Sequence, residues 1–373
     1  MLSNSILLSN LFFTSSLSAA LVIRLSARTS RRELAAILGI GVLLLGWFGV
    51  SGAAYKRVMV GAGYFGVAAL LTTLLAVVFF DRSLPRIKLL AEMAVGPVSI
   101  VILVFALAVS SGANPVYDRY LYAFDGSFGF QPGFLAARTL LAHDWLRMAG
   151  EIAYINLPLA IGAIYVVSKK QSAQGATEFF RAVAAIGAVG YLCYLIFPAV
   201  GSAAAFRGAF PFREPALEPG WVMPVSFGLS PRNCIPSLHT SWAIALWRTG
   251  RSGSGAIRCA LGCYLFFLLF ETLACGHYLI DLIAAVPFTL AIRAASASFQ
   301  PGKLVLHWKP LLAGIALFAG LLLLIRFGWD LSRNSPAIPV LFSALTIAIC
   351  GWAERQSPLS RAPQPAVLEP AIG

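Results

Sequence analysis

Residues 256–294 read AIRCALGCYLFFLLFETLACGHYLIDLIAAVPFTLAIRA: two apolar runs interrupted by Cys275-Gly276-His277. A helix rises about 1.5 Å per residue, so about 20 apolar residues cross the roughly 30 Å hydrocarbon core of a bilayer. Similar runs recur along all 373 residues, of which 59% are hydrophobic and 12% charged. Soluble domains carry roughly 25% charged residues, and disordered chains are poorly hydrophobic. The sequence therefore predicts an all-α, polytopic membrane helix bundle.

The apolar runs predict about eleven membrane spans. They lie at approximately 6–26, 33–55, 58–80, 89–111, 149–168, 179–199, 236–250, 256–276, 278–294, 309–327 and 336–353. We divide the chain into about three N-terminal helices (1–88), a six-helix core (89–295), about two C-terminal helices (296–357) and a disordered tail (358–373).

The basic residues predict how the bundle is oriented. Most of the 28 Lys and Arg fall on one side if the loop at 24–34 faces the cytoplasm, as the positive-inside rule requires. Because this distribution and anionic lipid account for the net charge of +13, we do not interpret that charge as binding of nucleic acid. The long loops 112–148 and 200–235 then face outward. We expect an integral protein of a bacterial inner membrane.

Two of the four histidines lie at the edges of apolar runs. His239 begins one predicted span, and His277 lies two spans later, so both reach the same membrane face. Asp281 follows His277 at helical spacing, and a carboxylate beside an imidazole fixes its tautomer and exposes the other nitrogen as nucleophile or base. A second histidine can then act as general acid. The alternative is an ordinary buried His–Asp hydrogen bond between helices.

The two histidines lie in recognisable motifs. The strings PSLH (236–239) and GHYLID (276–281) resemble the second and third motifs of the type 2 phosphatidic acid phosphatase superfamily. They are most similar to its inositol phosphorylceramide synthase-like branch, which has PSLH in place of PSGH. The segment 197–201, FPAVG, is similar to a stretch that precedes the second motif there. The resemblance covers about residues 89–295 and implies a six-helix catalytic core.

The resemblance implies a role for each residue. His277 would attack phosphorus and form a phosphohistidine, Asp281 would orient it, and His239 would protonate the leaving oxygen. Ser237 would help to hold the phosphate, and Pro236 would occupy the first turn of the following helix. The chemistry implied needs no metal and no cofactor. We expect the site on the extracytoplasmic face.

The chain departs from the superfamily pattern in its basic residues. The first motif is absent, and Glu271 occupies the position where the third motif has an arginine. The phosphate would then need other cations, for which we select Arg207 and Arg232 from the outer loop. Glu271 would bind a cationic or hydroxylated head group, or pair with an arginine.

The six cysteines show no zinc-ligand spacing, so the sequence predicts no metal site. Cys234 and Cys275 both lie on the outer side, close to the two histidines. They would either form a disulfide or remain two free thiols.

The sequence therefore predicts a membrane enzyme that cleaves the phosphate ester of a lipid phosphate or phospholipid. Water or an alcohol would accept the phosphoryl group, so phosphatase and head-group transferase both stay open. The alternatives are a transporter or lipid-binding protein that uses the same groups as a proton relay or structural link, and a catalytically inactive scaffold. The sequence does not determine the oligomeric state.

Overall fold

The structure is a computed structural model that describes residues 115–356 except 219, 227–231, 301–302 and 305–306. The predicted spans between residues 6 and 111, the N-terminal unit 1–88 and the tail 358–373 lie outside the described residues. The total of eleven spans, the six-helix core and the domain boundaries therefore stay predictions.

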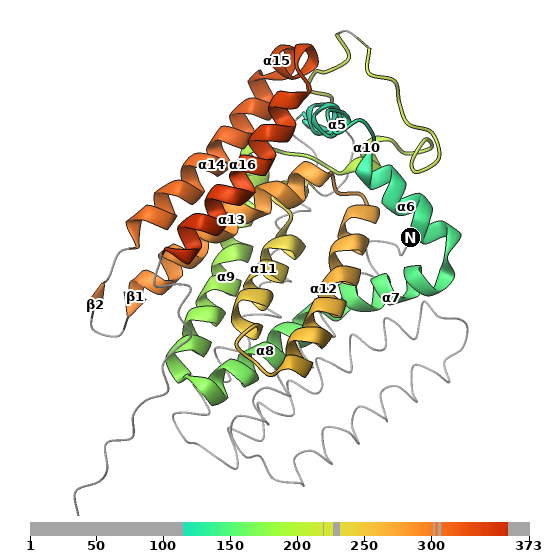
Figure 1. Ribbon diagram of the computed structural model, residues 1–373. Helices are drawn as coiled ribbons and strands as arrows, with labels where there is room; N and C mark the ends of the chain where they lie inside the picture. The colour runs from blue at the N-terminus through green and yellow to red at the C-terminus, as the bar shows by residue number, and fades with distance from the viewer. Residues whose placement is uncertain (1–114, 219, 227–231, 301–302, 305–306, 357–373) are drawn as a thin grey trace, which may run out of the picture.

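The regular elements of the described chain are helices and one short antiparallel strand pair (Figure 1). The elements are α5 (Asp118–Gly126), α6 (Pro132–Ala142), α7 (Asp144–Ile155), α8 (Leu157–Gln171), α9 (Ala173–Ile196), α10 (Ser202–Ala205), α11 (Leu238–Gly250), α12 (Gly255–Ala274), α13 (Leu279–Ser298), β1 (Phe299–Gln300), β2 (Lys303–Leu304), α14 (Trp308–Phe327), α15 (Trp329–Asn334) and α16 (Ala337–Arg355).

Five of these helices, α9, α12, α13, α14 and α16, are long and apolar enough to cross a membrane. The predicted span 149–168 is not one continuous helix, because α7 and α8 meet at a bend of 58°. Pro158, at the second position of α8, lacks the N–H that would continue the α7 ladder. The predicted span 236–250 corresponds to α11, which has only 13 residues.

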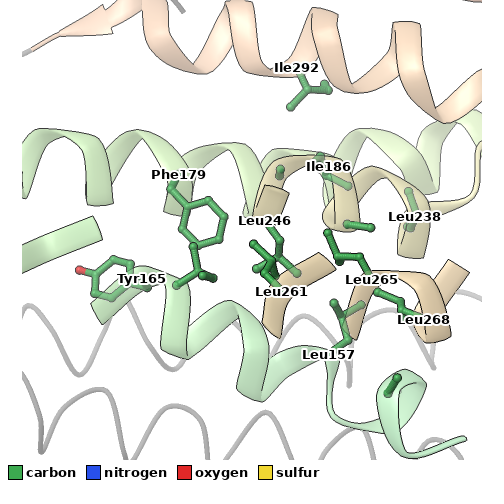
Figure 2. Packing of buried hydrophobic residues seen from close by; sticks show 14 of the residues in the cluster. Leu157, Tyr165, Phe179, Ile186, Leu238, Leu246, Leu261, Leu265, Leu268 and Ile292 are labelled. Atoms are coloured by element: carbon green, nitrogen blue, oxygen red, sulfur yellow. The ribbon is translucent and has the colours of Figure 1, made fainter. Parts of the chain in front are cut away.

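Helix α13 lies at the centre of the bundle. Of its most apolar stretch 72% is buried, against 22–33% in the other four candidate spans. It packs against α9 and α11 on one side and against α14 and α16 on the other (Figure 1). Figure 2 shows part of the core, where Leu246 of α11 lies beside Leu261 of α12. The other candidate spans turn large side chains outward, among them Phe266, Leu323 and Leu345, each at least half exposed, as expected for helices facing lipid.

The two predicted outer loops meet at one end of this bundle. Val116 and Val225 form an antiparallel bridge between them. An aromatic cluster fills the space beneath, in which Tyr122 contacts Phe134, Phe206 and Trp221. The loops therefore form a packed cap over the ends of α11, α12 and α13, close to both motif histidines.

A buried ion triad holds the opposite end. Glu354 of α16, 4% exposed, pairs with Arg248 of α11 at 2.6 Å and with Arg293 of α13. Arg248 lies nine residues after His239 on the same helix, or about 14 Å along its axis. Arg248 and Arg293 thus join three helices through Glu354.

Candidate active site

His277 lies in the turn between α12 and α13, at the edge of the cap. Gly276 adopts φ 130°, a left-handed conformation that turns the chain sharply before the histidine. Helix α6 passes so close that a Cβ on Gly133 would lie 2.7 Å from the His277 carbonyl oxygen. The histidine is thereby held between two helices and is 8% exposed.

Asp281 pairs with this histidine, as the spacing predicts. Its Oδ2 lies 3.2 Å from His277 Nδ1 and also accepts the backbone N–H of Tyr278 at 2.9 Å. Asp281 is the third residue of α13, so its reach back to Tyr278 follows the capping-box pattern of helix starts. The same local hydrogen bond that begins the helix thus also fixes the carboxylate beside the imidazole.

Cys234 is a neighbour that sequence spacing does not reveal. Its thiol donates to Asp281 Oδ2 at 2.7 Å and lies 3.6 Å from His277 Nδ1. Burial raises the pKa of this thiol well above its usual value, which keeps it protonated as a donor. No disulfide joins it to Cys275, whose thiol instead donates to the Thr272 carbonyl. Of the two sequence alternatives, the structure has the free thiols.

His239 lies in the first turn of α11 and is half-buried. Its ring stacks on Tyr154 of α7, with centroids 3.9 Å apart. Ser237 is the helix cap: its Oγ accepts the N–H of Thr240 at 3.3 Å and is fully buried. Pro236 therefore precedes the cap and is not in the first turn, which corrects the sequence prediction.

A cavity of about 650 Å³ opens beside these residues. Its lining includes His277, Cys234 and Tyr154, so the ring that stacks on His239 forms part of the wall. Of the two arginines selected from the sequence, Arg207 lines the cavity, whereas Arg232 does not. Arg232 is buried, which lowers its pKa, while the nearby charge of Asp118 acts in the opposite direction.

Three further charged residues line the cavity: Arg147, Glu151 and Glu271. Glu271 packs against Gly150 of α7, and its buried Oε2 accepts no hydrogen bond within the described part of the chain. Neither Glu151 nor Glu271 forms an ion pair within the described part of the chain. The expectation that Glu271 pairs with an arginine is thus not met among the described residues, and a ligand head group stays open.

Two aspartates of α5 hold the site from the cap. Asp118 accepts the N–H groups of Val200 and Gly201, at 3.0 and 2.7 Å, and the hydroxyl of Tyr278. Asp125 accepts the first N–H groups of α13, at 2.7 and 3.0 Å. Burial raises the pKa of Asp118 to about 6 and that of Asp125 to about 8. In the sequence, these two residues are visible only as two acids within an aromatic segment, and that pattern does not indicate which groups they bind.

Comparison with known proteins gives a family match over part of the chain. No curated protein and no solved structure matches the chain. Residues 119–295, from α5 to α13, match the family model of the PAP2 superfamily, and the matched stretch includes His239, His277 and Asp281. The match points to a phosphatase-type phosphoesterase. It does not distinguish the inositol phosphorylceramide synthase-like branch within the superfamily.

Proposed function

We propose that the protein is a membrane enzyme that cleaves a phosphate ester of a lipid through a phosphohistidine on His277. The observation that carries the proposal is His277, which lines a cavity large enough for a phosphorylated head group and pairs with the buried Asp281 behind it. Since Asp281 engages Nδ1, Nε2 is the nitrogen left to act as nucleophile.

The first step would form the phosphohistidine. The lone pair of His277 Nε2 attacks phosphorus, and the bond from phosphorus to the ester oxygen breaks. His239, in its protonated form, gives a proton to the departing oxygen. Asp281 stabilises the positive charge that develops on the His277 ring.

The second step would return the enzyme to its starting state. Neutral His239 takes a proton from water or an alcohol, whose oxygen attacks phosphorus as the bond to Nε2 breaks. Water gives inorganic phosphate, and an alcohol gives a new phosphate ester. Tyr154 holds the plane of the His239 ring by stacking on it.

The transferring phosphoryl group needs cations around its oxygens. We assign this role first to Arg207, because it lines the cavity with His277. Arg147 lies in the same lining and is a second cation that the sequence does not single out. Arg232 lies outside the lining, and the Ser237 hydroxyl is engaged in the helix cap, so their contacts with phosphate stay predictions.

A lipid substrate fits the surroundings of the cavity. Apolar residues of α6, Ala137, Leu140 and Leu141, form one wall, and Leu141 is half exposed. We infer that the acyl chains leave the cavity along this side while the phosphate reaches His277. The carboxylates Glu151 and Glu271 would contact the head group or the incoming alcohol. We place the site on the extracytoplasmic face.

The test is phosphate release or head-group transfer from a panel of lipid phosphates, by purified protein with EDTA present. We expect His277→Ala to abolish activity and His239→Ala to reduce it about 100-fold or more. His143→Ala is the matched control, because that histidine is exposed and outside the cavity lining. A base-stable, acid-labile phosphoryl label should appear on wild type and not on His277→Ala.

Full activity in His277→Ala would overturn the mechanism. No turnover of any lipid phosphate by wild type would instead favour the transporter or lipid-binding alternative.

A further inference from the structure

Three metal-donor atoms converge beside the active-site cavity. They are Cys234 Sγ, His277 Nδ1 and Asp281 Oδ2, all within 4.8 Å of one another, and all three residues are buried. The separations are 2.7 Å for Sγ–Oδ2, 3.6 Å for Sγ–Nδ1 and 3.2 Å for Nδ1–Oδ2. The proposed chemistry uses the histidine and the aspartate but gives the thiol no step.

We propose that Cys234, His277 and Asp281 form a binding site for Zn²⁺, and that the bound ion inhibits the enzyme. A tetrahedral zinc ion has bonds of about 2.3 Å to sulfur and about 2.0–2.1 Å to nitrogen or oxygen, so neighbouring ligands lie about 3.3–3.7 Å apart. Two of the three observed separations are already close to these values. The third, Sγ–Oδ2, lengthens when the hydrogen bond between them is replaced by the metal.

The charges of the cluster match those of zinc. A thiolate, a carboxylate and a neutral imidazole together carry two negative charges, so the occupied site would be neutral, as a buried site requires. Thiolate and imidazole favour zinc over Mg²⁺ or Ca²⁺, which prefer oxygen ligands. Asp281 Oδ1 is buried and accepts no hydrogen bond among the described residues, so the carboxylate has a free oxygen with which to adjust.

The cavity supplies what the three residues lack. Cys234 and His277 both belong to its lining, so an ion can reach them from the open side. A water molecule from the cavity would complete the tetrahedron. Three protein ligands with one open position is the arrangement of accessible zinc sites, whereas structural zinc sites are closed by four.

Inhibition follows from the tautomer of His277, and this part of the inference rests on the proposed function. Zinc takes the lone pair of Nδ1, so the ring proton moves to Nε2. The nitrogen that would attack phosphorus then carries a proton and has no free lone pair. The thiol loses its proton to water on binding, so one proton is released per zinc ion.

The binding test uses the purified full chain with zinc alone, in competition with a chromophoric chelator. We expect one ion per chain for wild type and at least about 100-fold weaker binding for Cys234→Ser, since loss of a direct ligand should exceed the 10–100-fold effect of an outer partner. Cys275→Ser is the matched control, because that thiol also lines the cavity but lies outside the cluster. Mg²⁺ and Ca²⁺ should not compete.

Two readouts do not depend on the variants folding or on activity. Zinc should protect Cys234 of the wild type from alkylation, measured by peptide mass, and X-ray absorption should show one sulfur ligand at about 2.3 Å with lighter ligands at about 2.0 Å. An unprotected Cys234, or a spectrum without sulfur, would overturn the site. Equal zinc affinity of Cys234→Ser and Cys275→Ser would do the same.

The activity arm separates the two proposals. Wild-type turnover should fall with zinc occupancy and recover with chelator, whereas Cys234→Ser should retain its own zinc-free rate at the same concentration. Turnover without zinc binding refutes the site alone. Zinc binding without any turnover refutes the proposed function and leaves the site.

Discussion

Asp125 closes the amino end of the helix that carries Asp281. Its carboxyl group, 1% exposed, accepts the N–H groups of Leu279 and Ile280 at 2.7 and 3.0 Å. Asp125→Ala leaves the buried N–H of Ile280 and the partly buried N–H of Leu279 without an acceptor. Each unsatisfied donor costs about 1–3 kcal/mol, so we expect a total loss of about 2–6 kcal/mol in the free energy of unfolding. Asp125→Asn keeps one carbonyl oxygen, and we expect about half that loss.

The assay is thermal unfolding of the purified protein in detergent, followed by tryptophan fluorescence, with turnover measured well below every midpoint. The midpoints should fall in the order wild type, Asn variant, Ala variant. Turnover should fall in the same order, because the first turn of α13 positions Asp281 beside His277. The control is Asp144→Ala: that aspartate is 89% exposed and, among the described residues, pairs with Arg147 alone, so about 0.5 kcal/mol or less is expected.

Two results would contradict this reasoning. One is an Asp125→Ala midpoint equal to that of Asp144→Ala, which would mean that the two hydrogen bonds contribute nothing. The other is an Asn variant less stable than the Ala variant, which would mean that the lost acceptors do not determine the cost.

Three further predictions follow from the same structure. Glu354→Ala should lower stability by about 3–5 kcal/mol by leaving two partly buried arginines without their carboxylate, and an unchanged thermal midpoint would refute this. Gly150→Ala places a Cβ 2.6 Å from Glu271 Oε2 and should raise KM for lipid phosphates. Gly187→Ala is the control and should leave KM unchanged, because the nearest atom to its new Cβ is 3.6 Å away. Equal KM values for the two variants would contradict this prediction. Burial raises the pKa of Asp125 from 3.8 to about 8, so the folded state holds this proton more tightly than the unfolded state does. The resulting stabilisation of the folded state is fully present below pH 3.8 and is lost as the pH rises through 8. The thermal midpoint of wild type should therefore fall from pH 5 to pH 9, more steeply than that of Asp125→Asn; parallel curves would contradict the shift.

Sequence reasoning succeeded where the cause is local. The apolar runs at 179–199, 256–276 and 278–294 each overlap most of a long helix, since hydropathy over 20 neighbouring residues decides whether a segment can face lipid. The break in 149–168 was missed although Pro158 is visible, because proline within an apolar run is tolerated in membrane helices and does not by itself show a bend.

The active-site residues likewise include some that local sequence predicts and some that depend on the folded chain. His277 and Asp281 are four residues apart, so the turn and first helical residues bring them together without help from the rest of the chain. Arg207 and Arg232 could not be ranked from sequence, because which one lines the cavity depends on how the loop 200–235 folds against α6.

The amino-acid sequence by itself determined the helical membrane class, the motif pair and the His–Asp contact, since periodicity and short spacing act within a few turns. Only the tertiary structure decided that Cys234 contacts Asp281, 47 residues away, and that Asp125 caps a helix about 150 residues later. Those contacts form when separate helices pack, and packing depends on the shapes of whole surfaces, which no single segment carries.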